Sequence, residues 1–395
     1  MKFKSGFSST LIFACLLLFS FTVTAQEMQA PVISLSPERG FWIESQDGFM
    51  GLKLGFRLQQ QLIIETPYSE DESIQTNFFI RRGRLLFKGY VFDKKLNYFI
   101  QLGVDRGQIT LLNAEYRWKP NSTTQVSFGQ LFPTTGRQFQ TSSKNLQLAD
   151  RSDVTRFFFT DWDLGISARK SFLVNDHLAF KVGISITHGE GKNMATAPGG
   201  WAYASRFEVL PFGLFNANGD YSESDLYHEP TPKLSIGAAY YFNQDAYTKY
   251  GNTEWKGLND NINEYYLDAI FKYNGFSFLG EFIHRTVENE LLVTPFNTLL
   301  FSEKVSGKGL YIQGGKFISE NLEPVFRISF LNPDDRAQTS RNKFIEQQKF
   351  VLGLNYFMLL HNLKFQYQLG YIQQKFMDQG SKSYLESLAQ FTISF

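Results

Sequence analysis

Polar and apolar residues alternate along the stretch from Phe78 to Val91. In a β-strand, successive side chains point to opposite faces. One face of this stretch then carries Phe79, Leu85 and other apolar residues, whereas the opposite face carries three cations, Arg82, Arg84 and Lys88. On this strand alone, a soluble sheet with one buried face is favoured over a transmembrane barrel, so the choice depends on the rest of the chain.

The same alternation recurs along most of the sequence, in segments separated by turn residues. We predict about 16 antiparallel strands, an even number, as in single-chain bacterial barrels. Short turns and longer polar segments alternate, which is typical of periplasmic turns and external loops. Two connections break this rule, because 211–230 is long where a turn is expected and Asp105–Gln108 is short where a loop is expected. The predicted strands lie near 50–64, 78–91, 96–105, 112–118, 126–132, 161–172, 176–188, 201–210, 231–243, 262–274, 275–286, 307–318, 321–331, 346–358, 361–376 and 384–395.

The amino-acid composition favours a transmembrane barrel over a soluble β-sandwich. The mean hydropathy is polar, at −0.24, yet the chain holds 41 Phe and 19 Tyr. A barrel explains both values, since every second residue faces a polar interior and aromatic residues form belts at the membrane interfaces. The last strand alternates in the same way and ends on the aromatic Phe395, which resembles the signal that the barrel-assembly machinery recognises.

The first residues predict export. Residues 1–25 read as a cleaved signal peptide, with a basic start, an apolar run and small residues before the cleavage point. The apolar run is shorter than the roughly 20 residues of a spanning helix. The sequence holds one cysteine, Cys15, inside this signal, so the exported chain has no disulfide. We interpret 26–47 as an irregular leader and 48–395 as the barrel.

Several strings, in this order, resemble the phosphate-selective porin O and P family. The resemblance runs from about Phe41 to Phe395 and implies a trimeric barrel in the outer membrane of a Gram-negative bacterium. It also implies contact with outer-membrane lipid and lipopolysaccharide, and passage of phosphate-like anions along arginines and lysines in the lumen. The strings are 51–59 (GLKLGFRLQ), 79–84 (FIRRGR), 128–133 (FGQLFP), 163–166 (DLGI), and 355–357 (NYF) followed by 361–364 (HNLK).

The polar faces of the predicted strands carry more cations than acids, and guanidinium groups bind phosphate oxygens through two parallel hydrogen bonds. We expect charge reversal at Arg82 and Arg84 to change ion preference with little effect on folding. For the cations other than Arg57, Arg82, Arg84 and Lys88, the alternative is that they pair with acids and stiffen the barrel wall. Arg81 has lipid-facing parity and is expected to reach the membrane rim. The expected lumen track consists of Arg57, Arg82, Arg84, Lys88, Arg117 and Arg169.

Residues 134–160 form a long connection that is rich in cations. The family resemblance implies that this loop folds into the barrel and narrows the pore, and the alternative is an external loop with solvated charges. The candidate constriction residues are Arg137, Lys144, Arg151 and Arg156.

Other classes of function find little support. None of the five histidines is expected inside the wall at mid-height, so an enzyme with a histidine base is not predicted. Acidic pairs such as Asp334-Asp335 fall at turns, so we predict neither a metal nor a cofactor. The formal net charge of +1 gives no attraction to nucleic acid. Within the barrel class, an anion-preferring channel leads, and the alternatives are a general porin or a barrel closed by 26–47 or 211–230.

Overall fold

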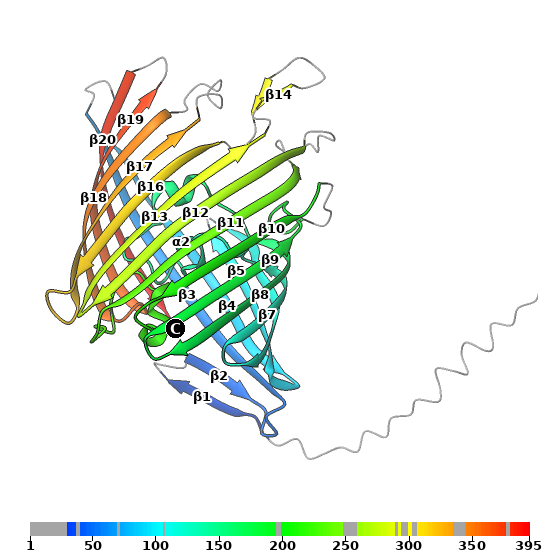
Figure 1. The fold of residues 1–395 in the computed structure, drawn as a ribbon. Coiled ribbons are helices and arrows are strands. Elements are labelled where there is room, and N and C mark those ends of the chain that lie inside the picture. Colours follow the sequence, from blue (N-terminus) through cyan, green and yellow to red (C-terminus); the bar gives the residue numbers. More distant parts are fainter. Residues whose placement is uncertain are drawn as a thin grey trace, which may run out of the picture.

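The computed structural model describes residues 30–36, 40–68, 72–105, 107–194, 199–247, 259–288, 291–293, 299–301, 306–334, 344–376 and 380–395. Sixteen strands in these ranges pair antiparallel, in chain order, around a closed barrel (Figure 1). The predicted all-β antiparallel barrel of about 16 strands is therefore confirmed. The wall strands are β3 (Met50–Pro67), β4 (Gln75–Val91), β5 (Asp93–Asp105), β6 (Gln108–Asn121), β7 (Thr124–Leu131), β8 (Asp163–Asn175), β9 (Leu178–Thr187), β10 (Ala202–Leu210), β11 (Lys233–Tyr247), β12 (Asn259–Tyr273), β13 (Phe276–Val287), β16 (Gly307–Lys316), β17 (Leu322–Pro333), β18 (Phe344–Leu359), β19 (Leu363–Phe376) and β20 (Gly380–Ser394).

The last strand closes the ring by pairing with the first wall strand. Ser394 of β20 lies opposite Arg57 of β3. The Phe395 N–H donates to the Phe56 carbonyl at 3.0 Å, and the Phe56 N–H donates back to Phe395 at 3.2 Å. Closure pairs the backbone groups that an open sheet edge would expose.

The two faces of the wall differ as the alternation predicts. Outward side chains such as Leu352 and Leu267 are apolar and largely exposed, whereas inward side chains such as Gln313 and Gln390 are polar and fully buried. None of the helices in the described ranges is both long enough and apolar enough to span a membrane. Short connections such as Phe92 lie at one end of the barrel, called the short-turn end, and most longer connections lie at the opposite, long-loop end, where the pair β14 (Leu291–Val293) and β15 (Leu299–Phe301) stands (Figure 1).

The leader contains regular structure that the sequence analysis did not predict. Strands β1 (Val32–Ser36) and β2 (Gly40–Glu44) form a hairpin, and β2 pairs with β3. Strand β3 continues beyond the end of β20, so its edge from Gly51 to Leu54 is available to β2. The interpretation of 26–47 as irregular is therefore wrong for these ten residues, because an unpaired strand edge recruits a partner. The predicted signal, residues 1–25, lies outside the described residues.

Two connections fold into the barrel. The segment 134–160, called the inner loop, carries the short helices α2 (Arg137–Gln140) and α3 (Asp153–Phe157). Its side chains bond to wall strands on several sides, for example Gln147 to Ser277 at 2.8 Å and Thr160 to Glu264 at 2.9 Å. The segment 211–230, called the lower segment, enters from the short-turn end with the 3-10 helix η1 (Asn216–Tyr221). The inner loop therefore lies inside the barrel, as expected, and the extra length of 211–230 is used in the lumen.

Candidate functional site

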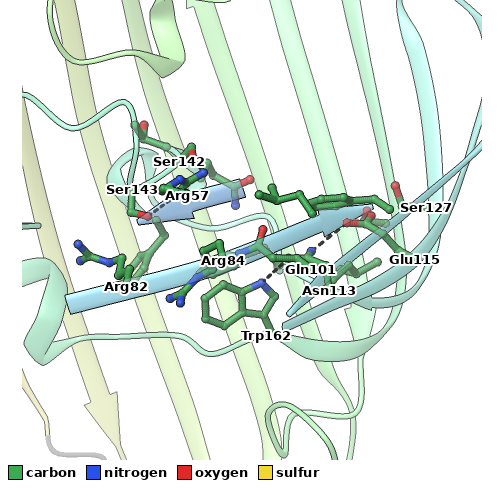
Figure 2. Close-up of a pocket in the computed structure, with 18 of the residues that line it drawn as sticks. Arg57, Arg82, Arg84, Gln101, Asn113, Glu115, Ser127, Ser142, Ser143 and Trp162 are labelled. Carbon is green, nitrogen blue, oxygen red and sulfur yellow. Dashed lines mark hydrogen bonds between the residues drawn. The ribbon is translucent and has the colours of Figure 1, made fainter. Parts of the chain in front are cut away.

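A cavity of about 590 Å³, called the main cavity, lies between strands β3 to β8 and the inner loop (Figure 2). Of the described residues that line it, nine are Arg or Lys and one, Glu115, is acidic. This excess gives the cavity a positive potential, since a low-dielectric wall concentrates the field of its charges. The nine cations are Arg57, Arg81, Arg82, Arg84, Lys88, Arg117, Arg151, Arg156 and Arg169.

The register between β3 and β4 places cations of the two strands side by side on the inner face of the wall. Arg57 of β3 lies directly opposite Arg84 of β4, and Lys53 lies opposite Lys88 in the same way. Side chains at such positions are close enough for like charges to repel. The chain thus holds adjacent cations on one wall, an arrangement that favours an anion between them.

Arg81 differs from the expectation. The register between β3 and β4 shifts between Gln59 and Gln60, which leaves Arg81 as an extra residue in a β-bulge. Its side chain points inward and its Nε donates to Asp150 at 3.0 Å. The assignment of Arg81 to the lipid-facing rim is therefore wrong, because a bulge reverses the alternation on its far side. Consistently, Ile80 is exposed on the outer surface.

The four cations of the expected track have different partners. Arg82 pairs with Asp150 at 2.7 Å, and Arg84 pairs with Asp105 at 2.5 Å. Arg57 instead donates to the hydroxyls of the inner loop, to Ser143 at 2.8 Å and to Ser142 at 3.2 Å (Figure 2).

Lys88 lies over the Phe99 ring, with its Nζ 4.9 Å from the ring centre. Among the described residues, Arg57 and Lys88 form no ion pair, so their charges are the least neutralised of the four.

Asp150 fastens the inner loop to this wall. It accepts hydrogen bonds from Arg81, Arg82 and the Gln61 amide. Burial alone would raise the pKa of the Asp150 carboxyl, but Arg82 and Arg81 hold that pKa well below its usual range. The carboxylate therefore stays charged and its role is positional, because it balances part of the arginine charge and fixes the loop.

Arg117 and Arg169 continue the basic lining on β6 and β8. Arg117 pairs with Glu115 at 2.6 Å and stacks over Phe99, with 4.5 Å between its guanidinium carbon and the ring centre. Arg169 donates to the Gln140 side chain of the inner loop at 2.5 Å. Arg117 is thus partly neutralised by an acid, as the alternative interpretation allowed, whereas Arg169 bonds to a neutral amide.

A second cavity of about 720 Å³, called the lower cavity, lies at the short-turn end. It shares Arg57, Leu86, Lys88 and Ser142 with the main cavity. Of the described side chains that line it, none is Asp or Glu, and the added basic groups are Lys53, Lys144 and His361. The chain end at Phe395 also borders it.

The sequence from 52 to 393 matches the phosphate-selective porin O and P family. The chain belongs to this family. It is therefore a porin of the bacterial outer membrane, a channel and not an enzyme. A comparison with curated proteins gave no match.

Solved porin structures share the fold of this porin at low sequence identity. OmpF of Salmonella typhi, in complex with daunomycin, is 12% identical with a TM-score of 0.57, covering 89% of this chain and all of that one. An anion-selective porin from Comamonas acidovorans is 10% identical with a TM-score of 0.56, covering 87% of this chain and all of that one. The trimer form of OmpT of Vibrio cholerae is 11% identical with a TM-score of 0.50, covering 87% and 99%.

The inner-loop cations of this porin occupy unequal positions. Arg156 lines the main cavity with a half-exposed side chain, and Arg151 lines it while donating to the Gln138 and Thr141 carbonyls. Lys144 borders the lower cavity and donates to Asn362 at 2.8 Å. Arg137 is fully buried and lines neither the main cavity nor the lower cavity. It is therefore an anchor of the loop and not a pore-lining residue.

Sequence reasoning missed the neutral partners of this site. Ser142, Ser143 and Gln140 meet the wall arginines only because the inner loop folds back, and their residue types carry no signal of that contact. His361 lies in the turn between β18 and β19, where its ring is buried and its Nε2 bonds to the Ser222 hydroxyl at 2.9 Å. Within the described ranges, no group of three or more His, Asp or Glu residues is placed to hold a metal ion.

Proposed function

We propose that this porin is a passive diffusion channel that prefers anions, with phosphate or polyphosphate as the favoured class. The observation that carries the proposal is the main cavity, with nine basic residues to one acidic residue among its described lining. Several such weak sites in series let an anion enter without being trapped. Guanidinium groups match phosphate oxygens better than they match chloride, because they offer two parallel donors.

The proposal includes an orientation and partners. We assign the short-turn end to the periplasm and the long-loop end to the outside, with the apolar outer wall against membrane lipid and lipopolysaccharide. We further propose a homotrimer, and recognition of Phe395 by the barrel-assembly machinery. The trimer form of the OmpT neighbour supports the assembly by analogy of fold alone.

A general porin and a closed barrel are the alternatives. The closed barrel has one specific observation in its favour, because the inner loop and the lower segment both occupy the lumen and bond to each other, with Glu223 N–H donating to the Asn145 carbonyl at 3.0 Å. Against it, the main and lower cavities lie next to each other and share four lining residues.

Recordings in planar bilayers test the proposal. The purified porin is expected to give discrete current steps, a reversal potential of anion-preferring sign under a chloride gradient, and a chloride current that phosphate reduces at millimolar concentration or below. Steps with a cation-preferring reversal potential would contradict the anion assignment. A membrane that shows inserted protein and no steps would favour the closed barrel.

The anion preference is expected to weaken above neutral pH. Burial, together with the nearby charges of Arg57 and Lys53, lowers the pKa of the Lys144 ammonium to about 8. Because the charged form is the protonated form, Lys144 carries its charge below about pH 8 and loses it as the pH rises. The reversal potential under a salt gradient should therefore move toward zero as the pH is raised from 6.5 to 9.5, because the channel becomes less selective for anions. Lys144→Arg keeps its charge at these pH values and should reduce this pH dependence, and an unchanged profile in that variant would contradict the role of Lys144.

A further inference from the structure

A third cavity, of about 400 Å³ and called the side cavity, also opens at the short-turn end. It lies beside the turn between β6 and β7, where Ser122, Thr123 and Thr124 line it. Its charged lining comes from several elements, and includes Lys119, Arg169, Lys181 and Arg206, with Glu208 as its one Asp or Glu among the described lining residues. Two of the cations are paired with acids, Lys181 with Asp220 at 2.5 Å and Arg206 with Glu208 at 2.8 Å.

The side cavity adjoins the main cavity at a different place from the lower cavity. It shares Gln125, Gln140 and Arg169 with the main cavity. The main cavity therefore has two neighbours at the short-turn end, with Arg57 at the boundary to one and Arg169 at the boundary to the other. The two neighbours meet at Asn218, which lines both of them.

The two boundaries are built alike. At each, an arginine of the wall donates to a neutral side chain of the inner loop: Arg57 to Ser143 at 2.8 Å, and Arg169 to Gln140 at 2.5 Å. In both arginines the Nε is buried and has no hydrogen-bond partner among the described residues. Such an arginine has unused donor capacity, since a guanidinium offers five N–H groups. An oxyanion that reaches either boundary can take the place of the hydroxyl or amide with a stronger, charge-assisted hydrogen bond.

The tip of the lower segment divides the two routes and is firmly held. Ala217 and Asn218 both have positive φ, 49° and 56°, a sharp reversal that few residues other than glycine adopt. Just after them, Arg137 donates to the Asp220 carbonyl at 2.9 Å and the Tyr221 hydroxyl bonds to Glu208. A fixed divider between two cavities explains why this connection is long where a short turn was expected.

We propose that the pore forks: an anion in the main cavity leaves to the periplasm either past Arg57 and Lys88 through the lower cavity, or past Arg169 and Gln140 through the side cavity. The inference rests on the proposed function for the identity of the permeating ion. The class of ligand is the same in both branches, a small oxyanion. The side branch is the less selective one, because acids neutralise two of its cations, whereas no Asp or Glu side chain lines the described part of the lower cavity.

The test uses single cysteines, which the chain allows because Cys15 of the predicted signal is its one cysteine. Leu360→Cys lies in the lower cavity alone and Thr124→Cys in the side cavity alone. Each variant, and the double variant, is treated from the short-turn side with a bulky neutral methanethiosulfonate reagent, with mass spectrometry to verify complete labelling. His177→Cys, in an exposed turn outside the described cavities, is the matched control.

Parallel branches predict that each single label removes part of the conductance, roughly a third to two thirds, and that the double label removes most of it. The control label should leave it unchanged. A complete block by the Leu360→Cys label alone, or an unchanged conductance in fully labelled Thr124→Cys, would overturn the fork. The reversal potential of the unlabelled channel tests the anion preference separately. A cation-preferring channel with two partial blocks would keep the fork and reject the proposed function.

Discussion

Replacement of both Arg57 and Lys88 by glutamate should reduce the ratio of anion to cation permeability about tenfold or more, a change of roughly 1.4 kcal/mol or more in relative barrier height. Each substitution removes one positive charge and adds one negative charge at the boundary shared by the main and lower cavities. A unit charge 4 Å from an ion contributes about 1 kcal/mol even at the dielectric constant of water, so two reversals suffice for this effect.

Folding of this double variant is expected to be nearly unchanged. A glutamate at position 57 can accept hydrogen bonds from the Ser142 and Ser143 hydroxyls, and it would lie opposite Arg84. Opposite charges across two strands are favourable. The matched control is Lys94→Glu with Lys95→Glu, which gives the same change in net charge at the exposed start of β5, outside the main and lower cavities. A reversal potential that is equal in the double variant and in the control would remove the physical basis of the anion assignment.

The structure changes which residues this experiment should use. From the sequence, Arg82 and Arg84 are the central pair of the track, and their reversal is expected to leave folding intact. In the folded chain Arg82 holds Asp150, so a glutamate there would face a carboxylate that fastens the inner loop. Arg57 and Lys88 have no acidic partner among the described residues. The better targets are therefore the cations that the wall leaves unneutralised, which strand parity alone does not distinguish.

Strand number and position were predictable because the alternation follows directly from a wall with a wet inside and an apolar outside. Polar and apolar residues alternate with a period of two along the strands. Each of the sixteen predicted segments therefore corresponds to a wall strand of the structure. The failure at Arg81 has the opposite cause. One extra residue in β4 changes the face of every residue beyond it, and no residue type near the bulge announces the shift.

The inner loop shows a second limit of sequence reasoning. Its cation density and its length are visible in the sequence, but the partner of each cation depends on contacts far away along the chain. Arg137 meets Asp268 and Glu208, more than seventy residues away, whereas Arg156 pairs with Asp153 in the same short helix. All four cations of the inner loop were therefore expected to line the constriction. In the structure, Arg137 is a buried anchor of the loop, whereas Arg156 is a half-exposed cation that lines the main cavity.

This difference leads to the prediction with the second large effect. Arg137→Ala should loosen the inner loop and give larger, noisier current steps with weaker ion preference. Arg137 is fully buried and bonds to Asp268 at 2.6 Å, to Glu208 at 3.1 Å and to the Ser235 hydroxyl at 2.8 Å. Breaking a buried ion pair by removing one partner typically costs about 3 to 5 kcal/mol, because the remaining charge is left without compensation.

The cost for Arg137→Ala should lie near the lower end of that range, about 3 kcal/mol, since Arg206 still pairs with both carboxylates. That cost falls on the docking of the loop, while the wall strands keep their own backbone pairing, so the barrel should still resist unfolding by detergent and heat. Arg156→Ala is the control within the same loop: it removes the same charge from a half-exposed site, and should lower anion preference slightly with no added current noise. Equal noise and conductance in the two variants would show that Arg137 does not anchor the loop.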